Sequence, residues 1–320
     1  MPELVHPLRK VRNLGDVISA TIETIRLHIK PLFFAVTKHA GPLAITGSVL
    51  LAVAQTFTLS ASFSDILMQR QTLADAQPAY YFLQFIGMIL VAFASITVAN
   101  VVISYLQFVD NNEREPEAAE LAAAMRWRTS KLLLTTIFVA FLFSAVISLA
   151  ILAAVLLMRS SEAAFVSIPI VVLGFLYIIV PLIVLYPVVL FEDRGFFDAL
   201  KRCRQLVKNK WWWTLGTAFM IALISSTINV LGNLPFYVVS GISVFMTNSG
   251  DSSEPNIIVQ ILSIIFGSFA SLVGIYVSTI TITGVTYIYW SHRERIEGVS
   301  LFDRIESIEI DNHLVDEPEP

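Results

Sequence analysis

Hydrophobic residues fill six long stretches of the sequence, and none of these stretches contains a charged residue. They are residues 41–62, 79–109, 132–158, 164–191, 211–247 and 256–290. Each is longer than the roughly 20 residues that a helix needs to cross a bilayer core of about 30 Å. A Lys, Arg or Asp at the centre of a spanning helix costs about 2.5–3.5 kcal/mol, which explains why the charges are confined to the intervening segments. The pattern predicts an all-α, polytopic membrane protein with six transmembrane helices.

The segments between the hydrophobic stretches carry a helical pattern of their own. Before the first stretch, apolar residues recur at every third or fourth position: Leu14, Ile18, Ile22, Ile25 and Ile29. Charged residues lie between them, which is typical of an amphipathic helix. In residues 195–213, the predicted apolar face holds Phe196, Leu200, Cys203, Val207 and Trp211. We expect these amphipathic helices to lie at the membrane interface on the cytoplasmic side.

The sequence divides into three parts on this basis. Residues 1–40 form a cytoplasmic N-terminal segment with an amphipathic helix, residues 41–290 the six-span transmembrane domain, and residues 291–320 an acidic cytoplasmic tail. A polar segment precedes each pair of spans, so the chain can be interpreted as three copies of one hairpin unit. Any two-span hairpin needs a polar lead-in, however, and the sequence leaves both interpretations open.

Proline and glycine predict where the helices are interrupted. Pro31 and the Gly41-Pro42 pair are expected to separate the N-terminal helix from the first span. The fifth span is expected to break near Leu231, because Pro235 follows it closely. In the fourth span, we expect a kink or an end at each proline, namely Pro169, Pro181 and Pro187.

The lysines and arginines predict the orientation in the membrane. If the N-terminus is cytoplasmic, every Lys and Arg except Arg70 and Arg159 lies on the cytoplasmic side. This is the distribution that the positive-inside rule describes, and it places both termini in the cytoplasm. Aromatic residues at the inner edges of the last two spans are expected to be interfacial anchors: Trp211, Trp212, Trp213 and Trp290.

Few polar residues lie inside the spans, and none of them carries a charge at neutral pH. Asn100, Asn229 and Asn233 could line a polar path for a substrate, or could simply form hydrogen bonds between helices. The histidines all lie outside the spans, and the sequence contains no metal-binding, nucleotide-binding or nucleophile motif. We therefore expect no catalytic residue, no metal ion, no cofactor and no enzymatic activity.

Cations are concentrated just before the fifth span. The cluster consists of Lys201, Arg202, Arg204, Lys208 and Lys210. At the inner leaflet, each cation can contribute about 1 kcal/mol to the binding of anionic lipid headgroups. The same residues would also satisfy the positive-inside rule. The sequence alone does not separate a headgroup site from a topological signal.

The segment from Pro187 to Trp213 combines a proline-bearing span, an acidic residue, a glycine and a basic helix that runs into a Trp-rich span. The matching residues are Glu192, Gly195, Ala199, Leu200, Lys201, Arg202, Leu206, Lys208 and Trp212, whereas Cys203 replaces the usual Ser and Asn209 the usual Gly. The pattern resembles bacterial integral-membrane families that include the membrane domain associated with glycerophosphoryl diester phosphodiesterases. In those fusions a separate soluble domain performs catalysis. The resemblance therefore implies a membrane module of the bacterial inner membrane and not a hydrolase.

These features favour a non-enzymatic integral membrane module that organises partner proteins or anionic lipids at the inner leaflet. The alternative is a transporter or permease subunit for an uncharged or lipidic substrate. Membrane lipids are the expected ligands, and other membrane proteins or a second copy of the chain are the candidate protein partners. We expect no binding to nucleic acid.

Overall fold

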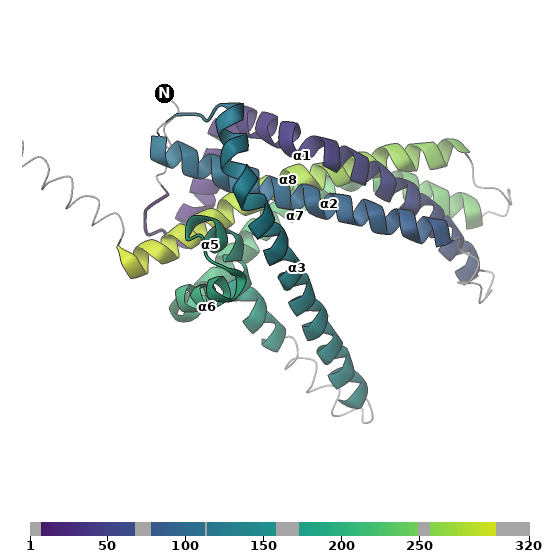
Figure 1. The fold of residues 1–320 in the computed structure, drawn as a ribbon. Coiled ribbons are helices and arrows are strands. Elements are labelled where there is room, and N and C mark those ends of the chain that lie inside the picture. Colours follow the sequence, from purple (N-terminus) through teal and green to yellow (C-terminus); the bar gives the residue numbers. More distant parts are fainter. Residues whose placement is uncertain (1–7, 68–77, 113, 158–172, 249–256, 299–320) are drawn as a thin grey trace, which may run out of the picture. The chain divides into compact units, whose positions relative to one another are not determined.

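The structure is a computed structural model that describes residues 8–67, 78–112, 114–157, 173–248 and 257–298 (Figure 1). These ranges contain helices and no strand. Six segments in them are long and apolar enough to cross a membrane: Leu14–Gln55, Tyr80–Asn112, Ala118–Leu149, Leu173–Phe191, Phe196–Ile242 and Ile257–Glu297. The predicted all-α, multi-pass membrane fold is therefore confirmed. Arg70, Arg159, Pro169 and most of the acidic tail lie outside the described residues.

Several helices extend beyond the charge-free stretches at their charged ends. In chain order the helices are α1 (Leu14–Leu67), α2 (Pro78–Asn112), α3 (Ala118–Leu157), α5 (Leu185–Phe191), α6 (Phe196–Val207), the short 3-10 helix η1 (Lys208–Lys210), α7 (Trp211–Asn248) and α8 (Ile257–Glu297). A further helix, residues 173–182, precedes α5. The helical pattern of the charged segments thus continues directly into the hydrophobic stretches that follow or precede them.

Two of the proline predictions differ from the structure. Helix α1 has one residue with non-helical dihedral angles, His28 (φ −103°, ψ 17°), in the turn before Pro31, but it continues through Pro42. Helix α7 contains Pro235 and does not break near Leu231, so that prediction is wrong. A proline inside a membrane helix is tolerated where neighbouring helices and local adjustments satisfy the freed backbone groups.

The predicted kink in the fourth span is present. The helix over 173–182 ends one residue after Pro181, residues 183–184 form a turn, and α5 begins at Leu185. Pro187 accounts for the break, because it has no N–H to donate to the carbonyl of Ile183 and its ring would clash with that carbonyl. The chain can therefore change direction just before the acidic residue Glu192.

The described residues form two compact units. The charged unit, as we name it, comprises residues up to 28, residues 103–221 and residues from 282 onward, and the apolar unit comprises residues 29–102 and 222–281. Four helices are divided between the units, with one segment in each unit: α1, α2, α7 and α8. Within the described ranges, the charged residues of the apolar unit are Lys30, Lys38 and Asp65.

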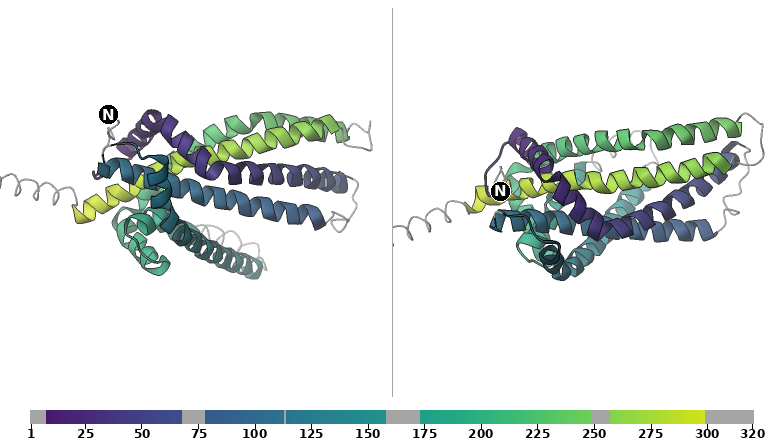
Figure 2. Two further views of the ribbon diagram at one scale, coloured as in Figure 1. Left: turned by 45° about the horizontal axis from the view of Figure 1, so that its top comes forward. Right: turned by 90° about the horizontal axis from the view of Figure 1, so that it is seen from above.

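The apolar unit is built from four helix segments that run alongside one another (Figure 2). Their backbones approach closely at glycines. A Cβ atom on Gly47 of α1 would lie 2.9 Å from the Leu90 Cβ of α2, and one on Gly232 of α7 would lie 2.5 Å from Val273 of α8. Small residues at such crossings let membrane helices gain van der Waals contact.

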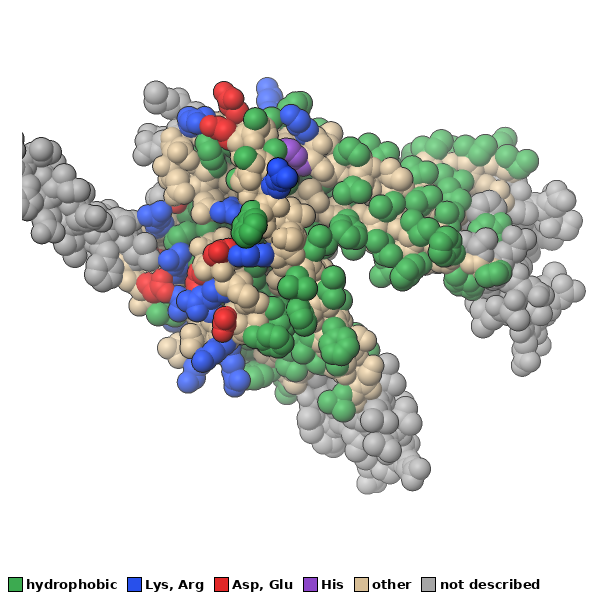
Figure 3. All heavy atoms as spheres, viewed as in Figure 1, with side chains coloured by type: hydrophobic (Ala, Val, Ile, Leu, Met, Phe, Trp, Pro, Cys, Tyr) green, Lys and Arg blue, Asp and Glu red, His purple; other side chains and the backbone are tan. Residues whose placement is uncertain are grey.

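Polar contacts between segments far apart in the sequence hold the charged unit together. The Leu8 N–H donates to Asp110 at the end of α2 (3.2 Å), and the Arg12 N–H donates to the Ser291 hydroxyl near the end of α8 (3.0 Å). The hydroxyls of Thr24 and Tyr287 lie 2.6 Å apart. Figure 3 shows charged side chains gathered around α5 and α6, and hydrophobic side chains along α3.

Candidate functional site

A short loop, residues 192–195, places the basic helix α6 directly after α5. The N–H of Glu192 closes the last turn of α5 by donating to the Val188 carbonyl (3.0 Å), and Asp193 then adopts a positive φ of 53°. Asp is one of the residues that enter this left-handed region more readily than most. Gly195, in an extended conformation, is the N-cap of α6. The loop thus ends one helix and starts the next within four residues.

Helix α6 has one buried face and one exposed, basic face. Ala199, Cys203, Leu206 and Val207 are buried, and Cys203 is 0% exposed. The Cys203 side chain is therefore part of the core of the charged unit.

An ion-pair cluster ties α6 to the end of α8. The Glu192 carboxylate, only 7% exposed, accepts hydrogen bonds from the Arg202 Nε (3.0 and 3.1 Å) and the Tyr289 hydroxyl (3.2 Å). Arg202 also contacts the Glu297 carboxylate, which in turn accepts a hydrogen bond from the Arg293 Nε (2.8 Å). We refer to Glu192, Arg202, Tyr289, Arg293 and Glu297 as the α6 clamp.

The clamp separates Arg202 from the other four cations of the predicted headgroup cluster. Arg202 lies one helical turn after Ala199 and one before Leu206, so it borders the buried stripe. Its side chain is 13% exposed and is held between two carboxylates. The charge of Arg202 is thus compensated within the protein, and its expected role in headgroup binding stays a prediction.

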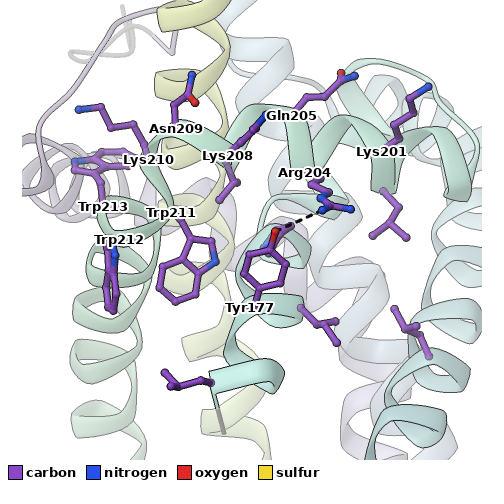
Figure 4. Close-up of a pocket in the computed structure, with 16 residues that line it drawn as sticks. Tyr177, Lys201, Arg204, Gln205, Lys208, Asn209, Lys210, Trp211, Trp212 and Trp213 are labelled. Atoms are coloured by element: carbon purple, nitrogen blue, oxygen red, sulfur yellow. Dashed lines mark hydrogen bonds between the residues drawn. The ribbon is translucent and has the colours of Figure 1, made fainter. Parts of the chain in front are cut away.

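The remaining cations surround a cavity of about 1240 Å³ in the charged unit (Figure 4). Its apolar lining comes from α3, from the helix over 173–182, and from α6: Leu142, Leu173, Ile178, Pro181, Leu200 and Val207. Its polar and aromatic lining comes mainly from α6, η1 and the start of α7: Tyr177, Lys201, Arg204, Gln205, Lys208, Asn209, Lys210, Trp211, Trp212 and Trp213. The cavity thus has a hydrocarbon-like wall and a basic rim.

The rim is positive without a compensating acid among the lining residues. Lys201, Arg204, Lys208 and Lys210 line the cavity, and no Asp or Glu does. Arg204 is the cation that Figure 4 shows in contact with another lining residue, since its Nη2 donates to the Tyr177 hydroxyl at 3.5 Å. A concave surface with one sign of charge over low-dielectric walls attracts ligands of the opposite charge.

The predicted aromatic anchors separate into two groups. Trp212 is 75% exposed and its ring meets that of Trp211 edge-on, with the centroids 4.8 Å apart. Trp213 packs against Arg295, whose guanidinium lies 5.6 Å from the ring centroid. Trp290 is only 5% exposed and packs edge-on against Phe191. Trp290 is therefore buried in the charged unit, and its expected role as an interfacial anchor stays a prediction.

The three asparagines of the predicted polar path lie in the apolar unit and do not line the cavity. The Asn229 and Asn233 amides donate to backbone carbonyls one turn earlier in α7, those of Ser225 (3.3 Å) and Asn229 (2.6 Å). Asn100 is fully buried on α2. These contacts give the amides of α7 local partners, and the polar path stays a prediction.

Sequence reasoning missed the residues that complete the cavity from other helices. Leu142 and Tyr177 lie within uniformly hydrophobic stretches, where nothing in the local pattern marks one residue above its neighbours.

No family model, curated protein or solved structure matches this chain. Within the described ranges, no group of three or more His, Cys, Asp and Glu side chains could hold a metal ion. The site is therefore defined by its own geometry and charge.

Proposed function

We propose that the protein is a non-enzymatic membrane module that binds anionic lipids through the cavity beside α6. The observation that carries this proposal is the combination of four cations, three tryptophans and an apolar wall around one cavity, with no lining carboxylate. Anionic lipids present the matching features, since each has a negative headgroup next to a hydrocarbon region. Any partner protein would associate with the module at the lipids bound by α6.

The charges are sufficient to make such binding selective. Each Lys or Arg close to an anionic membrane surface contributes about 1 kcal/mol, so the four rim cations together contribute roughly 4 kcal/mol. Since 1.4 kcal/mol is a factor of ten in affinity, this is close to a thousandfold preference over a neutral lipid. Exposed tryptophans such as Trp212 favour the headgroup level of a bilayer, which supports placing α6 there.

The same proposal places α6 at the cytoplasmic leaflet of a bacterial inner membrane. The positive-inside rule supports this orientation, because the rim cations and the N-terminal cations would then face the cytoplasm together. The resemblance of residues 187–213 to the membrane domain associated with glycerophosphoryl diester phosphodiesterases is consistent with a module of this kind. In this proposal α6 is an amphipathic interfacial helix.

Charge reversal of the rim tests the proposal. In the rim variant, Lys201, Arg204, Lys208 and Lys210 are each changed to Glu, and Arg202 is left in place because it belongs to the clamp. Purified protein in a neutral detergent is titrated with fluorescent phosphatidylglycerol and, separately, with phosphatidylcholine. We expect the rim variant to bind phosphatidylglycerol at least 100-fold more weakly and phosphatidylcholine about as well as the unmodified chain.

Four exposed cations elsewhere provide a matched control. Lys10, Arg26, Lys30 and Arg126 are exposed and do not line the cavity. Changing these four to Glu alters the net charge by the same amount, and we expect less than a threefold change in phosphatidylglycerol affinity. An equal loss in both variants, or no loss in the rim variant, would show that the cavity is not the binding site.

A further inference from the structure

The cavity contains a hydrogen-bond donor that the protein leaves without a partner. Trp211 lines the cavity, and its indole Nε1 is inaccessible to solvent and donates to none of the described residues. An indole N–H is a donor only, and burying it unpaired is costly. Figure 4 shows this nitrogen on the edge of the ring nearer to Tyr177. A ligand acceptor reaches this donor only when the Trp211 ring turns toward the cavity, and the hydrogen bond gained would favour that turn.

Arg204 supplies more donors on the same side of the cavity. Its guanidinium has five N–H donors in a planar fork, and its contact with the Tyr177 hydroxyl is long, at 3.5 Å. Arginine forks match the paired oxygens of phosphates and carboxylates. A ligand that satisfies both Arg204 and Trp211 needs several acceptor oxygens close together and a negative charge.

The apolar wall requires that the ligand also has a hydrocarbon part. Leu142, Leu173, Ile178 and Pro181 form this wall, and a small hydrophilic anion would leave it uncovered. The cavity volume, about 1240 Å³, exceeds the roughly 300–1,000 Å³ that is usual for small-molecule sites. An acceptor-rich anion with long hydrocarbon chains fits both the donors and the volume.

We infer that the cavity holds one glycerophospholipid, with its phosphodiester between Arg204 and the Trp211 N–H and an acyl chain along Leu142 and Ile178. This inference rests on the proposed function and deepens it. The proposed function needs only that anionic lipids bind at the cavity with any stoichiometry and any arrangement, whereas this inference assigns a single molecule to a specific set of contacts. Binding is then saturable, with one lipid for each chain.

Native mass spectrometry with added phosphatidylglycerol measures that stoichiometry, and three variants test the contacts. Trp211→Phe removes the N–H and keeps an aromatic ring, and we expect about tenfold weaker binding. Trp127→Phe is the matched control, because Trp127 is exposed and does not line the cavity, and we expect less than a twofold change. Ile178→Trp fills the apolar part of the cavity, and we expect loss of the one-to-one complex.

A further variant protects the test against a folding defect at Trp211. Arg204→Lys retains the positive charge but loses the planar fork, and we expect binding to weaken about fivefold to tenfold. Each variant is compared with the unmodified chain in thermal unfolding, so that a loss of lipid can be separated from a loss of fold. If Trp211→Phe does not fold, Arg204→Lys and Ile178→Trp still decide the outcome.

The outcomes distinguish this inference from the proposed function. If charge reversal of the rim weakens binding but Trp211→Phe, Arg204→Lys and Ile178→Trp do not, lipids bind the rim without entering the cavity, and the inference is overturned. Glycerol 3-phosphate is added as a competitor. If it displaces the lipid with equal affinity, the acyl chain contributes nothing and the inference is also overturned. Weak displacement, with a one-to-one complex sensitive to Trp211→Phe, supports it.

Discussion

The charged unit and the apolar unit share four helices, yet different interactions hold each of them together. In the apolar unit, helix backbones meet at glycines such as Gly47 and Gly232, and side-chain hydrogen bonds such as that of Asn233 often return to the same helix. In the charged unit, polar side chains join separate helices, as Glu192 does with Arg202. One chain therefore uses close packing where its residues are apolar and paired charges where they are not.

The difference follows from the solvent that each kind of residue can tolerate. Hydrocarbon gives no hydrophobic drive for helix association, so close van der Waals contact at small residues becomes the main attraction. A buried carboxylate needs a compensating charge and hydrogen bonds, and the Glu192 carboxylate receives both. Single substitutions should therefore act through different mechanisms in the two units, and this expectation can be tested.

The largest effect is expected from breaking the α6 clamp. Glu192→Gln keeps the shape of the side chain but removes the charge that faces Arg202 and Arg194. Breaking one side of a buried ion pair costs about 3 kcal/mol, and we expect a loss of this size in the free energy of unfolding, measured by detergent denaturation. Glu120→Gln is the control, because Glu120 pairs with Arg114 at the surface. Equal losses in both variants would contradict a buried role for Glu192.

A smaller effect is expected from crowding the apolar unit at a helix crossing. A Cβ on Gly47 would lie 3.0 Å from the backbone nitrogen of Val91, which cannot rotate away. We expect Gly47→Ala to destabilise by about 2 kcal/mol through overpacking. Gly241 lies in the same unit with no atom within 4 Å of its added Cβ, so Gly241→Ala should be neutral or stabilising by about 0.5 kcal/mol. The reverse order in thermal unfolding would refute the close crossing.

The sequence predicts six long apolar helices but not the places where they bend. Charge is excluded from hydrocarbon whatever the neighbours are, so a charge-free stretch is a local signal. Pro187 and Pro235 carry the same local signal, yet the chain breaks before Pro187 and continues helically through Pro235. Val273 of α8 lies against Gly232, close to Pro235. Whether a proline breaks a helix therefore depends on neighbours that the sequence pattern does not identify.

The candidate site was predictable to a similar, partial extent. The basic stripe was visible from helical spacing, and four of its five cations line the cavity. The sequence pattern does not reveal that Arg202 pairs with Glu297, because Glu297 lies near the end of α8, far along the chain. The pattern also does not reveal that Trp290 is buried, because its burial depends on Phe191 and on the N-terminal segment, whose Arg9 lies over its ring. Local sequence patterns indicate whether a helix face is basic or apolar. Contacts with segments far along the chain decide whether that face is buried.

A third substitution removes one buried hydrogen bond of the charged unit, and its expected loss of stability is smaller than the two above. Tyr287→Phe removes the hydroxyl that contacts Thr24 but retains the ring under the Arg12 guanidinium, 4.7 Å from its centroid. A hydrogen bond of this kind contributes about 1 kcal/mol, and we expect a loss of that size. Tyr237→Phe is the control in the apolar unit, because Tyr237 is 56% exposed. A loss at Tyr237 as large as at Tyr287 would show that buried polar contacts do not distinguish the units.

The last test perturbs the fold least, because it measures the labelling rate of Cys203 and not a loss of stability. It is also the most direct way to separate the two units. Cys203 is 0% exposed, so a maleimide reaches its thiol only when α6 moves away from the core. Maleimide labelling of the native protein at pH 7 should accordingly be much slower than labelling of an exposed thiol. Asn209→Cys in a Cys203→Ser chain provides an exposed control that labels at once.

Labelling of Cys203 can then be measured in the variants that weaken each unit. Glu192→Gln loosens the clamp that holds α6, so it should accelerate labelling at least tenfold, because α6 must move to expose the thiol. Gly47→Ala acts in the apolar unit and should leave the rate within twofold. Equal acceleration by both variants would mean that the two units open together, and the distinction between them would then describe composition and not stability.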